Sequence, residues 1–314
     1  MKNKLIKLID LGISPFVLFS AILMKRVRIL QSRLPVSKKI LLKVGVQPIR
    51  NHYYEPFFSA KQLRKALSEE RTLLGIDWNL TEQLDLLNSF DFQHEFENMP
   101  DNFIADTVFH FNNRAFGSGD AEFWYNIIRL KKPKKIIEIG SGNSTLMARL
   151  AIQKNQDENT SYQCEHICIE PYEMPWLEKT GVKTIRKKVE DMDVAFFGQL
   201  EANDILFIDS SHVIRPQGDV LFEYLEILPT LKSGVIVHVH DIFSPHDYPY
   251  QWLLGEIRLW NEQYLLEAFL SYNSQWKIIG AVNLLKNNHF EILKTKCPRI
   301  DTTREPGSFY IIKH

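Results

Sequence analysis

The sequence predicts an α/β protein in which a largely parallel sheet carries helices on both faces. Three observations lead to this class. Apolar runs of strand length alternate with helical patterns from residue 101 onward. The first run ends in a Gly-Ser-Gly turn that leads straight into a helical pattern. Two further runs follow a long helical stretch and predict a closing pair of strands. Such alternation is typical of βαβ units.

The predicted elements follow one another along the chain. Five parallel strands are expected at KKIIEIG, HICIEP, VKTIRKKV, DILFIDSS and SGVIVHVHD, with helices at STLMARLAIQ, near PWLEK and at GDVLFEYLEILPTL. A helix over WLLGEIRLWNEQYLLEAFLSY precedes the strands WKIIGAVNLL and GSFYIIKH. We therefore expect a main domain over residues 101–314 and a helical cap over residues 1–100, with a helix such as SAKQLRKALSEERTLL.

Composition narrows the possible partners. The 314 residues hold 38 Lys and Arg against 38 Asp and Glu, so the formal net charge is zero. Nucleic-acid binding normally requires a basic excess, and no nucleic-acid partner is expected. The three cysteines form no CxxC pair. This pattern indicates a reducing, cytoplasmic location without structural zinc.

The N-terminal region holds an uncharged run, Leu11 to Met24, followed by the basic cluster KRVR. A spanning helix needs about 20 apolar residues, so this run is short for one. Two interpretations remain. In the first, the helix packs on the protein or in a homo-oligomer interface, and the length criterion favours this one. In the second, residues 11–28 lie in a membrane surface with the basic cluster on anionic headgroups.

The glycine turn, Gly140-Ser141-Gly142, indicates a ligand held at a helix N-terminus. Thr145 stands where a dinucleotide site has its third glycine, and Glu138 lies inside the strand. A carboxylate there suits a ligand that carries an ammonium group better than one with a pyrophosphate. S-adenosylmethionine has an ammonium group, a sulfonium and no phosphate.

Other positions around the turn are candidate cofactor contacts. Glu170 ends the second predicted strand, where an acid can accept hydrogen bonds from both ribose hydroxyls. Glu190 and Asp191 follow the third strand and flank an adenine, or else belong to a solvated loop. Gly117 and Ser118 precede a helix and either close over the methionine end of the cofactor or form an ordinary N-cap.

Acids and histidines follow the fourth and fifth strands. Asp209 and His212 come after DILFI, while His240 and Asp241 end GVIVHVHD. Because carboxyl ends of neighbouring parallel strands share one edge, these four side chains are expected together beside the cofactor. His238, two residues earlier, is interpreted as a hydrogen-bonded core residue.

The motifs EIGSGNST, CIEP and DILFIDSSH, with the closing strand pair, resemble the class I S-adenosylmethionine-dependent methyltransferases. FGSGDAE, DSSHVIRPQGDV and HVHDIF are similar to a bacterial group of small-molecule or sugar methyltransferases. The resemblance implies a Rossmann-like seven-stranded sheet with an antiparallel last strand. It also implies Glu138, Gly140, Gly142 and Glu170 as cofactor contacts.

Two chemistries fit O-methylation of a small molecule or sugar. In catechol O-methyltransferases an acid and an acid–amide pair hold a metal, and Asp209, His240 and Asp241 occupy similar positions here with changed residue types. Magnesium or manganese would lower the pKa of the acceptor hydroxyl. The alternative is a metal-free reaction with His212 or His240 as general base. Rival functions are an NAD-linked oxidoreductase and a non-catalytic binding module docked at a membrane.

Overall fold

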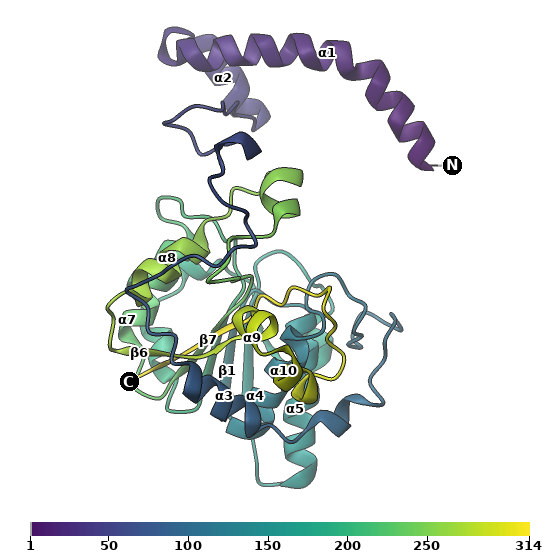
Figure 1. Ribbon diagram of the computed structural model, residues 1–314, viewed down its shortest axis with the longest axis vertical. Helices are drawn as coiled ribbons and strands as arrows, with labels where there is room; N and C mark the ends of the chain where they lie inside the picture. The colour runs from purple at the N-terminus through teal and green to yellow at the C-terminus, as the bar shows by residue number, and fades with distance from the viewer. Residues whose placement is uncertain (1) are drawn as a thin grey trace. The chain divides into compact units, whose positions relative to one another are not determined.

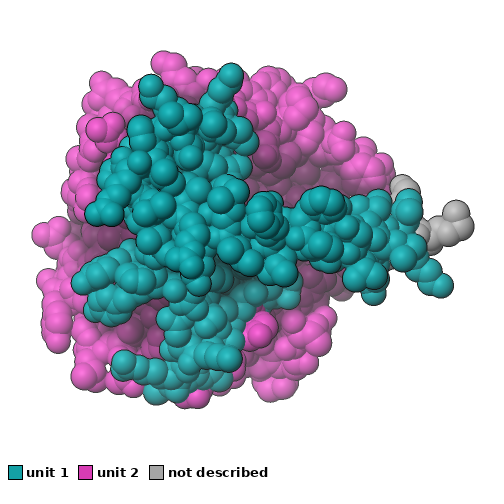
Figure 2. Space-filling model, turned by 90° about the horizontal axis from the view of Figure 1, so that it is seen from above, with its two compact units in different colours: residues 1–66, 251–259 teal, residues 67–250, 260–314 magenta. Residues whose placement is uncertain are grey.

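The computed structural model describes residues 2–314, and the chain divides into two compact units (Figures 1 and 2). The smaller unit comprises the chain up to Ala66 together with Gln251–Leu259. It contains helices α1 (Lys2–Leu30) and α2 (Pro35–Val44). The larger unit comprises Leu67–Tyr250 and Trp260–His314 and contains the whole sheet.

The sheet has seven strands in the order β3-β2-β1-β4-β5-β7-β6. Strands β1 to β5 pair in parallel, while β7 runs antiparallel to both β5 and β6. Their bounds are β1 Lys135–Ile139, β2 Glu165–Ile169, β3 Lys183–Ile185, β4 Ile205–Ile208, β5 Ile236–Val239, β6 Trp276–Ala281 and β7 Phe309–Lys313. The predicted Rossmann-like class with an antiparallel last strand is confirmed.

Helices cover both faces of this sheet, and the central strands are buried on both sides with mostly apolar side chains. Phe123 of α4 and Met147 of α5 pack with Ile136 on one face, whereas Ile227 and Leu266 pack with Ile137 on the other (Figure 1). The helices of the larger unit are α3 Leu80–Asn88, α4 Asp120–Lys131, α5 Asn143–Glu158, α6 Asp219–Phe222, α7 Leu228–Thr230, α8 Glu262–Leu270, α9 Val282–Asn288 and α10 Phe290–Lys296.

The units divide at residue 66, not at the expected boundary of 100. Residues 67–100 belong with the sheet because α3 covers the edge strand β6. The Gln83 side chain accepts a hydrogen bond from the Ala281 amide at 2.6 Å, and Asn79 donates to the Ile278 carbonyl at 3.0 Å. Phe90 packs edge-on against Phe123 in the core.

Two predicted helices differ from the structure. SAKQLRKALSEERTLL forms only a short turn at Ala60–Gln62, because Arg71 is held by tertiary contacts that override helix propensity. The Arg71 amide donates to the Pro245 carbonyl at 3.0 Å, and its guanidinium pairs with Glu267. The long helix predicted after β5 is confined to α8, with one separate turn at Gln251–Gly255. The run VNLL, expected in a strand, begins α9.

Candidate functional site

A cavity of about 630 Å³ lies at the carboxyl ends of β1, β2 and β4. This is the edge at which open α/β sheets bind their ligands. Backbone and side chains of Gly140–Ser144, Glu170–Met174, Lys188–Glu190, Asp209–Ser211, Arg215 and Asp219 line it, together with Ala115, Phe116 and Ile139. The predicted glycine turn and the acid after β2 therefore face one space.

The glycine turn is pressed against the end of β4. Gly140 has φ +79°, and a Cβ added there would lie 2.0 Å from the Asp209 carbonyl oxygen. The Gly140 amide donates to the Ile169 carbonyl at 3.0 Å, and the Asp209 amide donates to the Ile139 carbonyl at 2.8 Å. Only glycine meets both constraints, and the turn delivers the N-terminus of α5 to the cavity.

Replacing Gly140 by alanine is expected to lower the free energy of unfolding by about 2–4 kcal/mol, because a strained φ and a backbone clash add together. Urea denaturation followed by circular dichroism measures this value. Gly198→Ala is the matched control, since nothing lies within 4 Å of its added Cβ. Equal stability of the two variants would contradict the packing described here.

Glu138 lies beneath the turn instead of in the cavity, which corrects the expectation of direct cofactor contact. Its side chain is fully buried and accepts a hydrogen bond from the Thr145 hydroxyl. The Gly142 amide in turn donates to Thr145 Oγ1 at 3.2 Å. Thr145 at the place of a third glycine thus ties the turn to the strand. Glu138 is a positioning residue.

Glu170 lies at the cavity wall with one carboxylate oxygen engaged. Oε1 accepts the amides of Tyr172 at 3.0 Å and Glu173 at 2.9 Å. Oε2 accepts no hydrogen bond from residues 2–314. The local turn thus fixes the carboxylate and leaves one oxygen without a partner among the described residues, and ribose binding by Glu170 stays a prediction.

Of the four remaining candidate cofactor contacts, one lines the cavity and three do not. Glu190 lines the cavity and lies 3.6 Å from Arg215 Nη2, whereas Asp191 does not line it. Gly117 and Ser118 also stay outside the lining, where Ala115 and Phe116 stand instead. The Gly119 amide donates to Glu122 at 3.0 Å, as in an ordinary helix cap. Cofactor contact by Asp191, Gly117 and Ser118 stays a prediction.

Asp209, His240 and Asp241 meet beside this cavity. The ligand atoms of the three side chains all lie within 4.8 Å of one another. His240 Nδ1 lies 3.5 Å from an oxygen of each aspartate, yet it is buried and makes no hydrogen bond with the described residues. Two carboxylates and an imidazole nitrogen at this spacing could hold a divalent cation, and without one they form an ion pair when His240 is protonated.

Asp120 lies on the other side of the His240 ring, near its second nitrogen. His240 Nε2 lies 3.9 Å from Asp120 Oδ2. The second oxygen of Asp120 accepts the amides of Gly307 at 2.9 Å and Ser308 at 2.8 Å. A carboxylate behind a metal-binding histidine fixes the tautomer that leaves the opposite nitrogen free. The sequence shows Asp120 only as the first residue of a helix, 120 residues before its histidine.

His212 lies against the same pair of aspartates. Its Nε2 is 3.2 Å from Asp209 and 3.6 Å from Asp241, and its Nδ1 is 2.8 Å from Glu262. Glu262 is fully buried in the first turn of α8 and also accepts a hydrogen bond from the Tyr224 hydroxyl at 3.1 Å. Sequence reasoning missed Glu262, because an acid at a helix start looks like an ordinary end residue.

The pKa values in the cluster diverge. Burial lowers the pKa of both histidines, but carboxylate partners outweigh it, and the pKa of His212 and of His240 is raised well above the usual range. Burial raises the pKa of Asp209, but His240 and His212 bring it below the usual range. Burial raises the pKa of Asp241 to about 6, against the opposing effect of both histidines. The pKa shifts therefore favour an ionised Asp209 beside two protonated imidazoles.

His238 takes no part in the cluster. It is fully buried, stacks on Tyr310 at 4.1 Å between ring centroids, and burial lowers its pKa well below the usual range. It is a core residue, as interpreted from the sequence, although neither ring nitrogen hydrogen-bonds to the described residues.

Residues 137–242 match the family model of a methyltransferase domain. An uncharacterized protein from Archaeoglobus fulgidus is 29% identical over 168 residues, which are 49% of this chain and 74% of the relative. The O-methyltransferase TomG from Streptomyces achromogenes, solved with SAM, is similar at 12% identity and a TM-score of 0.37, over 73% of this chain and 89% of TomG. An O-methyltransferase from Bacillus cereus, solved with SAH, is similar at 10% identity and a TM-score of 0.36, over 74% and 91%.

Proposed function

We propose that this chain is a methyltransferase of the class I fold and that it methylates an oxygen atom of a small molecule or sugar with S-adenosylmethionine. The observation that carries the oxygen chemistry is the unpartnered Nδ1 of His240, held 3.5 Å from Asp209 and from Asp241 beside the cavity. A cation or a general base at this place would assist loss of the hydroxyl proton, whereas a neutral amine acceptor is nucleophilic without such assistance.

The cavity suits S-adenosylmethionine by its chemistry. When bound, this cofactor supplies an electrophilic methyl group on a sulfonium. Gly140 to Gly142 bring backbone close to the ligand, and the available oxygen of Glu170 would accept hydrogen bonds from the ribose. Thr145 stands where a dinucleotide site has its third glycine, and the buried Glu138 carboxylate lies beneath the turn, which disfavours a pyrophosphate and with it the NAD-linked alternative.

Asp209, His240 and Asp241 would hold a divalent cation, and Asp120 would orient His240. Such an ion lowers the pKa of an acceptor hydroxyl and positions it. Two carboxylates and one imidazole suit magnesium or manganese, with manganese favoured by the nitrogen ligand. Without an ion, the protonated imidazoles of His212 and His240 offset the negative charge of Asp209 and Asp241. Once His240 is neutral, that negative charge would attract the cation.

His212 would accept the acceptor's proton at Nε2 once its ring is neutral, which requires loss of the proton that Asp209 and Glu262 favour by raising its pKa. Glu262 holds Nδ1 at 2.8 Å, so the ring presents its other nitrogen toward Asp209. This carboxylate–histidine pair also supports the metal-free alternative, in which His212 acts alone as general base. The two mechanisms share the residue and differ in their need for a cation.

Tritium transfer from S-adenosyl-[methyl-³H]methionine to a panel of diols, phenols and sugars tests the proposal. With manganese, we expect label in an O-methyl product, and EDTA should reduce the rate at least roughly 10-fold. An EDTA-insensitive rate that His212→Gln removes would establish the metal-free alternative. Label found only on amines would contradict O-methylation.

Manganese binding should release protons and tighten as pH rises from 5 to 8. A ligating imidazole must be neutral, and the pKa of His240 lies well above the usual range in the absence of an ion. Because the free protein binds the proton more tightly than an exposed histidine does, low pH favours the protonated, ion-free form. Calorimetry in two buffers of different ionisation enthalpy measures the released protons. Affinity that is independent of pH would contradict His240 as a ligand.

A further inference from the structure

Helix α1 exposes nearly all of its apolar side chains. It runs for 29 residues, and none of its apolar window is buried against the rest of the chain. Phe16, Leu18 and Phe19 expose 76%, 64% and 71% of their surface. A water-soluble protein rarely leaves so large a continuous apolar surface in solvent, so this helix requires a partner environment.

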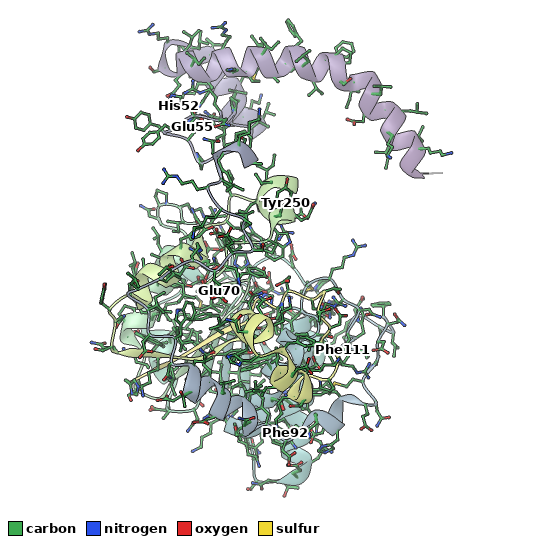
Figure 3. All side chains as sticks on the ribbon, in the orientation of Figure 1. His52, Glu55, Glu70, Phe92, Phe111 and Tyr250 are labelled. Carbon is green, nitrogen blue, oxygen red and sulfur yellow. The ribbon has the colours of Figure 1, made fainter. Side chains whose placement is uncertain are left out.

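The apolar residues surround α1 on every side. At 100° per residue, Leu11, Ile13, Phe16, Val17 and Phe19 point in directions that together circle the helix axis. Figure 3 shows side chains projecting from all sides of α1. A helix lying in a membrane surface would leave half of these side chains in water. An all-round apolar helix fits full burial.

Pro15 would normally harm such a helix, but its effect is compensated locally. Proline has no N–H to donate to the carbonyl four residues earlier, which is that of Leu11. The Ser14 hydroxyl donates to this same carbonyl at 2.8 Å. Hydrocarbon cannot hydrogen-bond an orphan carbonyl, and a serine that satisfies it is the device that membrane helices use. In water the repair would be needless.

Length and charge fit a bilayer. The 17 residues from Leu8 to Met24 contain one charge, Asp10, which lies near the end and three residues from Lys7. They extend about 26 Å, close to the roughly 30 Å of hydrocarbon, and Lys7 and Lys25 can reach the interfaces. Residues 25–44 hold seven basic and no acidic residues, and one of the basic residues, Arg28, pairs with Glu55 at 3.1 Å.

We propose that α1 inserts into a lipid bilayer and anchors the methyltransferase there, with the basic residues of 25–44 on anionic headgroups. This goes beyond the in-surface position considered from sequence alone, because the helix is apolar on all sides and its proline is satisfied internally. Basic residues beside the membrane are attracted to an anionic surface.

Flotation with phosphatidylglycerol–phosphatidylcholine vesicles tests the anchor on the full chain. The wild type should float and stay with the vesicles through an alkaline carbonate wash, which removes surface-bound proteins. Leu11→Asp combined with Leu18→Asp should reduce the floating fraction at least 10-fold, because Leu18 lies near the centre of the span, where a charge is strongly disfavoured, and Leu11 lies within its apolar part.

The matched control is Leu74→Asp combined with Leu225→Asp, since both leucines are exposed, at 88% and 61%, in the larger unit. This variant should float like the wild type. A wild type that stays at the bottom of the gradient would overturn the proposal, as would release by carbonate. Equal flotation of the two double variants would overturn it too, because α1 would then not be the anchor.

Discussion

Glu170→Ala should weaken the binding of S-adenosylhomocysteine by at least roughly 100-fold. Its free oxygen would accept two ribose hydroxyls, and a hydrogen bond to a charged group contributes about 1.5–3 kcal/mol. Equilibrium dialysis with labelled S-adenosylhomocysteine measures the change. Glu170→Gln keeps an oxygen for the amides of Tyr172 and Glu173 but places an NH2 donor where Oε2 would accept the ribose hydroxyls, so it should preserve the local turn and still weaken binding at least roughly 10-fold.

Glu165→Ala serves as the control for this series. Glu165 starts the same strand, β2, at its opposite end, and it pairs with Lys135 at 2.7 Å away from the cavity. Unchanged affinity is expected for it. Should Glu165→Ala and Glu170→Ala weaken binding equally, the effect would come from strand β2 as a whole, and Glu170 would lose its assigned role.

Removing the His240 imidazole should abolish manganese binding at micromolar concentrations. His240→Ala takes away one of three ligands, and Asp209→Asn should act in the same direction. Asp120→Asn keeps the oxygen that accepts the Gly307 and Ser308 amides but loses the charge behind His240, so a 10–100-fold loss of affinity is expected. The electron paramagnetic resonance signal of free Mn²⁺ measures binding directly.

His246→Ala is the control for the metal series, because His246 contacts Asn283 at 3.0 Å and lies outside the cluster. It should bind manganese like the wild type, and circular dichroism confirms that each variant folds. Full manganese binding by His240→Ala would contradict the proposed site and leave His212 with Glu262 as the catalytic pair.

The sheet could be predicted because each strand is a short apolar run and the runs alternate with helices. The convergence of Asp209, His240 and Asp241 was predictable for the same reason, since β4 and β5 are neighbours whose carboxyl ends coincide. The positions of the strands, and the residues that follow them, can be inferred from the local sequence pattern alone.

The supporting residues could not be predicted, because each comes from a helix start far along the chain. Glu262 reaches His212 across 50 residues, and Asp120 reaches His240 across 120. Glu138 was expected to contact the cofactor because a carboxylate suits an ammonium group. In the structure it lies beneath the turn and accepts a hydrogen bond from Thr145. The helix predicted around Arg71 does not form, because Arg71 binds Pro245 and Glu267 instead. Both partners are distant in sequence, so the local pattern could not reveal them.

The central claim is that the cavity binds S-adenosylmethionine beside a cation site. Calorimetric titration of the full chain with S-adenosylhomocysteine, with and without manganese, tests it most directly. We expect a dissociation constant for S-adenosylhomocysteine in the micromolar range. We also expect a separate manganese binding step that His240→Ala removes. No heat of binding under either condition would contradict the account and leave the glycine turn without a ligand.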